Sequence, residues 1–173
     1  MQIMAARQLL LLRHAKSNHD DPALADRDRP LAPRGERAAV AMGRYVREHD
    51  LSPALILCSS ATRARQTLDG VADGLDASTD TRIESELYEA SATGLLERLR
   101  RIGEKVPSAM LVGHNPAIER LALDLAAGGP DLAELAHKYP TGALAVLAFD
   151  GAWADLDADG ARLVAFVKPR DLE

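Results

Sequence analysis

The sequence predicts an α/β fold, a three-layer α/β/α sandwich whose central sheet is mainly parallel and includes an antiparallel strand. Short apolar runs alternate with amphipathic segments along the chain, and strands that alternate with helices are typical of a parallel sheet covered on both faces. The last two apolar runs lie close enough together for a hairpin, which would make one of them antiparallel. The length of 173 residues and the hydrophobic fraction of 47% suit a single domain over residues 1–173.

The first predicted strand and the first predicted helix are separated by a long polar segment. Residues 8–12 are continuously apolar and predict a buried strand, whereas residues 15–32 are polar and predict a loop. A helix opens at Pro33, because proline lacks the N–H that would be unpaired in a first turn. Its predicted apolar face carries Ala39, Met42, Tyr45 and Val46.

The second strand is predicted over residues 54–58 and precedes a helix over about 61–75. Ser59 and Ser60 lie between them and are predicted N-cap residues, because a serine hydroxyl can accept a hydrogen bond from the first turn. The remaining elements are predicted in the order short strand, helix, strand, helix, short helix, strand and strand, over residues 82–83, 91–102, 109–113, 115–127, 131–136, 143–149 and 162–167.

The charge is unevenly distributed. The formal net charge of -5 argues against general nucleic-acid binding, which needs a net basic face. Residues 1–65 hold 11 Lys and Arg against 7 Asp and Glu, a net of +4, and residues 66–173 hold 10 against 19, a net of -9. This asymmetry indicates either two solvated faces or an anion site in the first third, and composition alone leaves both open.

The cysteine content and the hydropathy exclude further classes. The single cysteine, Cys58, excludes an internal disulfide framework and a multi-cysteine zinc site. No apolar run approaches the roughly 18 residues of a membrane span, so no membrane partner is expected. The N-terminus has no signal-peptide pattern, and we therefore expect a cytoplasmic protein.

Three of the predicted strands are followed by polar side chains, chiefly imidazoles, cations and hydroxyls. They lie within residues 13–17, 59–63 and 113–116. Ligands bind outside the carboxyl ends of the strands in such open sheets, and parallel strands bring those ends to one edge. This edge would hold two imidazoles, two or three cations and several helix N-termini, which attract anions. The combination suits a dianionic group such as phosphate.

The residue types also predict a reaction. A neutral imidazole is a good nucleophile toward phosphorus near neutral pH, and phosphoryl transfer needs mainly positioning and cations, which arginine supplies in bidentate form. No His and Asp cluster has metal-ligand spacing, and no nucleotide-binding glycine motif is present. We therefore expect neither a metal nor a cofactor, and phosphate or sulfate is the expected ligand of the site.

Several segments resemble the motifs of a known family. Arg13-His14-Ala15 resembles the Arg-His-Gly signature of the histidine phosphatase superfamily, which has the phosphoglycerate-mutase-like fold. Residues 11–17 (LLRHAKS) and 28–31 (DRPL) are similar to the SixA-like phosphohistidine phosphatase branch, in which alanine is a common third residue of the signature. Residues 59–67 and 112–116 resemble the second block and the second-histidine block, and all blocks follow the family's order.

The resemblance implies roles for individual residues. His14 would be the nucleophile that carries a transient phosphoryl group, and Arg13 and Arg63 would grip the phosphate oxygens. His114 would donate a hydrogen bond to the phosphate. Asn115 either contacts the phosphate or caps the helix that follows.

The outer residues of the site have two interpretations each. Glu89 lies where larger members of the family carry a catalytic acid. It is therefore either the acid that protonates the leaving group or a solvated carboxylate. Asp28 is a weaker candidate donor, or orients Arg29 or Arg34. Four further residues either contact the substrate or are solvated. These are Lys16 and Ser17 in the loop after His14, and Arg29 and Arg34 at the rim of the site.

A cysteine phosphatase is a rival hypothesis that spacing excludes. Such enzymes separate the cysteine and the arginine by five residues, whereas four lie between Cys58 and Arg63 and six between Cys58 and Arg65. The predicted function is a metal-independent phosphatase with a phosphohistidine intermediate, acting on protein phosphohistidine. The alternatives are a phosphatase of a small phosphomonoester or sugar phosphate, and a non-catalytic phosphate-binding module. A monomer is the default expectation.

Overall fold

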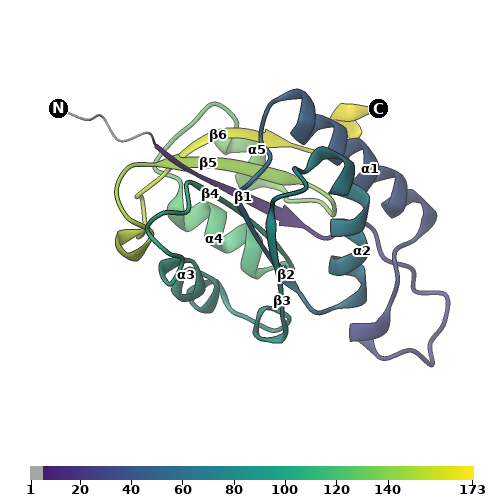
Figure 1. Cartoon of the computed structure of the whole chain (residues 1–173). Coiled ribbons are helices and arrows are strands. Elements are labelled where there is room, and N and C mark those ends of the chain that lie inside the picture. The colour runs from purple at the N-terminus through teal and green to yellow at the C-terminus, as the bar shows by residue number, and fades with distance from the viewer. Residues whose placement is uncertain (1–5) are drawn as a thin grey trace.

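Six strands form one central sheet in the computed structural model, which describes residues 6–173 (Figure 1). Residues 1–5 of the predicted domain lie outside the described residues. The strands are β1 (Arg7–Arg13), β2 (Leu55–Ser59), β3 (Asp80–Glu84), β4 (Ser108–Gly113), β5 (Leu144–Phe149) and β6 (Arg162–Val167). In the order β3-β2-β4-β1-β5-β6, the first four strands are mutually parallel, and β5 is antiparallel to both of its neighbours. The prediction of a mainly parallel sheet with an antiparallel strand is confirmed.

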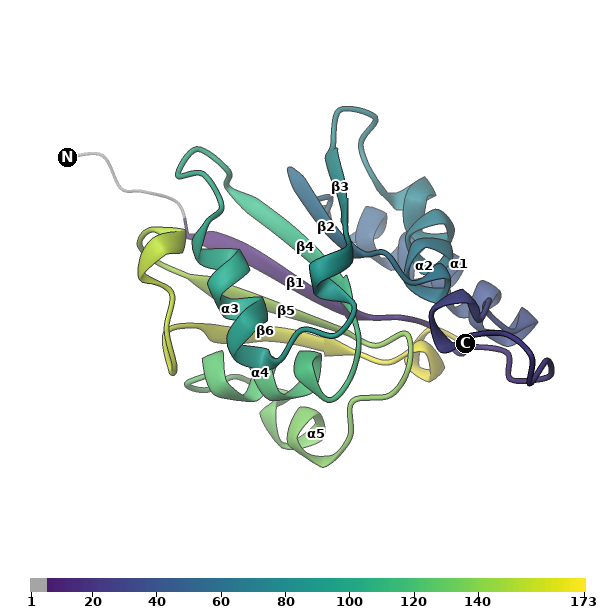
Figure 2. The ribbon, with the colours of Figure 1, turned by 90° about the horizontal axis from the view of Figure 1, so that it is seen from below.

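Helices cover both faces of the sheet (Figure 2). Their bounds are α1 (Pro33–Glu48), α2 (Thr62–Val71), α3 (Ala92–Arg100), α4 (Ala117–Leu125) and α5 (Leu132–His137). Helices α1 and α2 lie on one face, and α3, α4 and α5 lie on the other. The three-layer α/β/α arrangement is therefore also confirmed.

Side chains of β1 alternate between two hydrophobic cores. Leu9 and Leu11 belong to the core beneath α3 and α4, whereas Leu10 and Leu12 belong to the core beneath α1 and α2. All four are fully buried. A strand buried on both faces has no polar alternation, which explains why it reads as a continuous apolar run.

Helices α2 and α4 end earlier than predicted. Helix α2 ends at Val71 and continues as a 3-10 turn, Ala72–Gly74. Helix α4 ends at Leu125, because the backbone of the next two residues turns to Ala161: Ala126 forms an isolated bridge with it, and the Ala127 N–H donates to its carbonyl.

The prediction that Ser59 or Ser60 caps α2 is wrong. The N-cap is Ala61, which has no side-chain oxygen. The Ser59 hydroxyl accepts from the Ala61 N–H before the helix begins, and the Ser60 hydroxyl accepts from Arg27 at 2.6 Å. Both serines are therefore engaged with groups outside the first turn of α2.

The pairing of the strands brings three polar clusters to one edge. Arg13 of β1 pairs with Gly113 of β4, and Cys58 of β2 pairs with Val112 of β4. The three strands consequently end at the same level, with His14, His114 and Ser59 beside one another at the carboxyl edge. Within residues 6–173, none of the helices is long and apolar enough to cross a membrane.

Candidate active site

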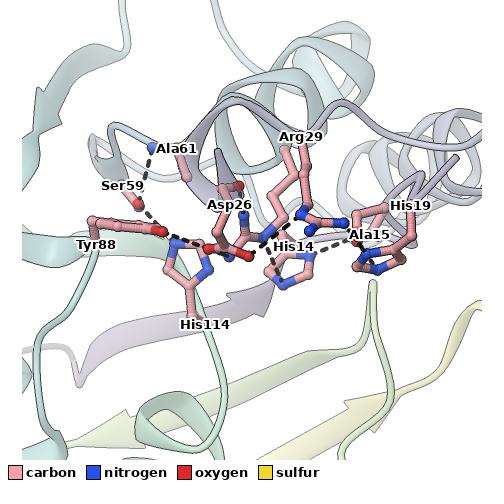
Figure 3. Close-up of polar contacts among 11 residues, drawn as sticks. His14, Ala15, His19, Asp26, Arg29, Ser59, Ala61, Tyr88 and His114 are labelled. Carbon is pink, nitrogen blue, oxygen red and sulfur yellow. Dashed lines mark hydrogen bonds and ion pairs between the residues drawn. The ribbon is translucent and has the colours of Figure 1, made fainter. Parts of the chain in front are cut away.

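His14 directly follows β1 and is 7% exposed. Its Nδ1 lies 2.8 Å from the carbonyl oxygen of Ala15 (Figure 3). A carbonyl oxygen only accepts hydrogen bonds, so Nδ1 carries the proton and Nε2 of the neutral ring keeps its lone pair. Burial lowers the pKa of His14 from 6.5 to about 3, and His114, Arg63 and Arg13 add repulsion that acts in the same direction. The ring is therefore neutral at neutral pH.

Arg63 approaches the reactive nitrogen of His14 from the first turn of α2. Its Nε donates to His14 Nε2 at 3.4 Å. The Thr67 hydroxyl, one helical turn further on, donates to the Arg63 carbonyl at 2.7 Å and accepts from the Ala15 N–H at 2.9 Å. Thr67 is fully buried and thus ties the loop that carries His14 to the helix that carries Arg63.

His114 follows β4 and packs beside His14, with 5.2 Å between the ring centroids. Its Nε2 lies 2.8 Å from the Ser59 hydroxyl, which already accepts from the Ala61 N–H. The Ser59 hydroxyl can donate to Nε2 or accept from it, and when it donates, the ring proton of a neutral His114 resides on Nδ1. Nδ1 is buried and has no hydrogen-bond partner within residues 6–173. Burial lowers the pKa of His114 to about 4, and Arg63 and Arg13 repel its charged form.

The carbonyl of Tyr139 holds two of the predicted site residues together. Arg13 donates to it at 2.8 Å and the Asn115 side-chain amide donates to it at 3.2 Å. Asn115 also accepts from the Glu119 N–H at 3.3 Å, so it satisfies a group in the first turn of α4. The Tyr139 hydroxyl is itself buried and donates to the carbonyl of Leu11 in β1. Arg13 is thereby fixed against the sheet.

The loop over residues 15–32 reaches back over the two histidines. Asp26 begins a 3-10 turn, Asp26–Asp28. Its carbonyl accepts from Arg63 Nη1 at 2.7 Å, and its carboxylate oxygen Oδ2 accepts from Arg63 Nη2 at 3.0 Å. Arg29 donates to the exposed His19 at 2.6 Å, and His19 also contacts the hydroxyl of the buried Ser17. Asp26, and not the predicted Asp28, is therefore the acidic partner of Arg29, at 3.8 Å.

Tyr88 closes the opposite side of the site. Its hydroxyl donates to Asp26 Oδ2, and its ring lies edge-on to His114 at 5.5 Å between centroids. The guanidinium groups of Arg27 and Arg63 lie 5.8 and 5.9 Å from the centre of the same ring. Tyr88 and Asp26 thus join the 85–91 segment to the 15–32 loop across the cluster (Figure 3).

The predicted site residues divide into two groups. The structure gathers His14, Arg13, Arg63, His114, Ser17, Arg29 and Asn115. Lys16, Arg34 and Glu89 are exposed, and their side chains form no hydrogen bond or ion pair within the described part of the chain. Ala15, which replaces the glycine of the resembled motif, is fully buried and packs with Leu31 and Ala39.

Sequence reasoning placed Ser59 at the predicted edge without a role in the site, and missed Asp26, Tyr88, Thr67 and Tyr139. Ser59 and Thr67 lie inside the motif over residues 59–67, which was the available signal for them. Asp26 shares its loop with three other aspartates, and nothing in the sequence distinguishes it from them.

Cys58 contributes no nucleophile. It is fully buried in β2, and burial raises the pKa of its thiol to about 12. A thiol with such a pKa is not ionised near neutral pH, and the thiolate is the reactive form. The structure thus agrees with the spacing argument against a cysteine phosphatase.

The cluster can bind and attack a phosphoryl group. It combines a neutral imidazole whose Nε2 lone pair accepts from Arg63, a second imidazole, two arginines whose charge acts on both rings and the backbone N–H groups that begin α2. Among residues 6–173, no group of three or more His, Cys, Asp or Glu side chains is arranged to hold a metal ion.

Comparisons with known proteins agree with this chemistry. Residues 9–118 match the model of the histidine phosphatase superfamily (branch 1). The uncharacterized protein Rv1276c of Mycobacterium tuberculosis (strain ATCC 25618 / H37Rv) is 42% identical over 163 residues, which cover 92% of this chain and 100% of that protein. Phosphohistidine phosphatase SixA of Escherichia coli (strain K12) is 26% identical over 145 residues, covering 83% and 86% of the two chains.

A solved structure gives the same assignment. A candidate SixA phosphohistidine phosphatase from Nakamurella multipartitia is 33% identical and superposes with a TM-score of 0.84, covering 96% of this chain and 98% of its own. The match of the family model and the shared fold agree. The chain therefore belongs to the histidine phosphatase superfamily, in its SixA-like branch.

Proposed function

We propose that this protein is a metal-independent phosphatase that hydrolyses protein phosphohistidine through a phosphoryl group carried on His14. The observation that carries the proposal is the hydrogen bond from His14 Nδ1 to the Ala15 carbonyl, which leaves the lone pair of Nε2 beside Arg63. Membership of the superfamily and similarity to SixA proteins support phosphatase chemistry.

The first half of the reaction transfers the phosphoryl group to His14. The lone pair of His14 Nε2 attacks phosphorus, the P–N bond of the substrate breaks, and its electron pair returns to the departing imidazole ring. Arg13 and Arg63 bind the phosphoryl oxygens, and His114 donates a hydrogen bond to them from Nδ1. Lys16, Ser17, Arg29, Arg34 and Asn115 are the proposed contacts to the phosphate or to the rest of the substrate.

The second half releases inorganic phosphate. A water molecule attacks phosphorus, the bond to His14 Nε2 breaks, and the water loses its protons to phosphate oxygens or solvent. His14 returns to the neutral state with the proton on Nδ1. No metal is needed in either half, because arginine side chains supply the positive charge that phosphoryl transfer requires.

A small phosphomonoester is the second candidate substrate. An ester needs a proton on its leaving oxygen, and Glu89 is the proposed acid for that case. Glu89 follows Tyr88, which lies at the site, but its own carboxylate is exposed. This placement favours phosphohistidine, since a protonated imidazole leaves without an acid.

The proposal is tested by assaying a phosphohistidine-bearing protein and a panel of phosphomonoesters in the presence of EDTA. The wild-type enzyme should release phosphate from phosphohistidine, and His14→Ala should lose this activity by at least about 10³-fold, as expected for a covalent nucleophile. His49→Ala is the matched control, because His49 is an exposed histidine at the end of α1. Glu89→Gln should retain hydrolysis of phosphohistidine within about twofold of the wild-type rate.

Three outcomes would contradict the proposal. Unchanged activity in His14→Ala would exclude His14 as the nucleophile. Loss of activity with EDTA would exclude the metal-independent mechanism. Phosphate binding with no turnover of any compound would indicate the non-catalytic module.

A further inference from the structure

Asp26 places a carboxylate among the cations that surround His14. Its Oδ2 accepts from Arg63 Nη2 at 3.0 Å and from the Tyr88 hydroxyl. The same guanidinium donates through Nε to His14 Nε2. One guanidinium group therefore separates the carboxylate from the nitrogen that attacks phosphorus.

A carboxylate at this position is unfavourable for a phosphate dianion, because like charges repel. Asp28, two residues further along the same 3-10 turn, has no side-chain hydrogen bond or ion pair within residues 6–173. An aspartate of this turn can therefore lie in solvent without a partner, as Asp28 does, whereas Asp26 is held against Arg63 and Tyr88. The placement of Asp26 indicates a role toward the part of the substrate beyond the phosphate.

The second oxygen of Asp26 is available to a substrate. Oδ1 has Arg29 Nε at 3.8 Å, which is beyond hydrogen-bond distance, and accepts no hydrogen bond from residues 6–173. The Asp26 side chain is 59% exposed. The hydrogen bonds from Tyr88 and Arg63 lower the pKa of Asp26, so the group is an acceptor near neutral pH and has no proton to donate.

We propose that Asp26 selects substrates whose leaving group is a cation while it is still bonded to phosphorus, by accepting a hydrogen bond through Oδ1 from the protonated imidazole ring of phosphohistidine. This inference rests on the proposed phosphohistidine phosphatase function. In phosphohistidine one ring nitrogen carries the phosphoryl group and the other can carry a proton. When the P–N bond breaks, its electron pair neutralises the ring, and imidazole leaves with that proton in place.

The same contact disfavours phosphate esters. An ester releases an anionic oxygen unless an acid protonates it, and a negative Asp26 repels that oxygen and supplies no proton. Removal of the charge at Asp26 should therefore slow hydrolysis of phosphohistidine and leave hydrolysis of esters unchanged or faster. A residue that only orients Arg63 would affect both classes equally.

The test compares Asp26→Asn with wild type on free phosphohistidine and on p-nitrophenyl phosphate, whose leaving group is an anion. We expect kcat/KM for phosphohistidine to fall by about 10- to 100-fold, the usual effect of losing a hydrogen bond to a charged group. The value for p-nitrophenyl phosphate should stay constant or rise. Asp28→Asn is the matched control, because it removes the same charge from the same turn, and it should leave both values near wild type.

A pH profile separates selection from positioning. A carboxylate beside the bound ring favours its protonated form and extends activity on phosphohistidine to higher pH. The alkaline limb of kcat should therefore move to lower pH in Asp26→Asn and return toward the wild-type position in Asp26→Glu.

Equal losses on both substrates, with an unmoved alkaline limb, would overturn the inference and leave the proposed function intact. An equally selective loss in Asp28→Asn would overturn it as well. A wild-type enzyme that hydrolyses p-nitrophenyl phosphate and not phosphohistidine would overturn the proposed function, and the inference with it.

Discussion

The chemistry of His14 depends on a hydrogen bond to its own chain neighbour. The Ala15 carbonyl holds the proton on Nδ1, and burial keeps the ring neutral. The residue type could be predicted from the sequence, because His14 ends an apolar strand within a recognisable motif. The tautomer could not, since it depends on the direction of a single carbonyl group. Asp26 and Tyr139 were unpredictable for the same reason: they act through loop conformation and a backbone carbonyl.

Histidine NMR gives a direct check of this tautomer. We expect the proton of His14 on Nδ1 at neutral pH and a titration midpoint well below 6.5, at about 3. Burial opposes the charged ring, so protonation requires a lower pH than in an exposed histidine. Long-range ¹H–¹⁵N spectra of ¹⁵N-labelled protein, assigned with His14→Gln, report both quantities. A midpoint near 6.5, or a proton on Nε2, would contradict the account.

At the scale of elements, the site depends on close contact between the 15–32 loop and helix α1. The first turn of α1 packs so near the loop that a Cβ added to Gly35 would lie 2.2 Å from the Lys16 carbonyl oxygen. That carbonyl accepts from the Ala32 N–H just before the helix. The sequence predicted the start of α1 correctly. Edge strand β3 was predicted too short, because its side chains are largely exposed and give a weak apolar signal.

Gly35→Ala should therefore destabilise the protein and reduce phosphatase activity. The added methyl group meets backbone that cannot move without displacing the loop after His14, and overpacking of this kind costs about 1–3 kcal/mol. Chemical denaturation measures the free energy of unfolding. Gly103→Ala is the control, since a Cβ there meets nothing within 4 Å. Equal stability of the two variants would show that the loop accommodates the methyl group.

At the scale of the molecule, the sheet concentrates positive charge that the overall composition hides. The net charge is -5, yet Arg13, Arg63 and Arg29 gather at one edge because three parallel strands end there. The choice between two solvated faces and an anion site could not be made from composition. Alternating strands and helices were sufficient to predict the sheet, since each side chain in its core needs only to be apolar.

The two buried histidines make stability depend on pH. Their pKa values are about 3 and 4 in the folded state and 6.5 in the unfolded state, so the unfolded chain binds more protons below pH 6.5. The stabilisation is complete above pH 6.5 and declines as the pH falls, by about 1.4 kcal/mol per pH unit for each histidine. Denaturation between pH 7 and 5 should show this slope, and His14→Gln should reduce it. The exposed His49→Gln is the control, and an unchanged slope in His14→Gln would contradict the prediction.

In the proposed mechanism, Nε2 of His14 carries the phosphoryl group during turnover. The most direct measurement mixes wild-type enzyme with phosphohistidine, quenches it in alkali within milliseconds, and locates phosphate by ³¹P NMR and peptide mass spectrometry. We predict phosphate on Nε2 of His14, formed and lost fast enough to explain the turnover rate, and none in His14→Ala. Phosphate on Nδ1 or on another residue, or full turnover in His14→Ala, would contradict it.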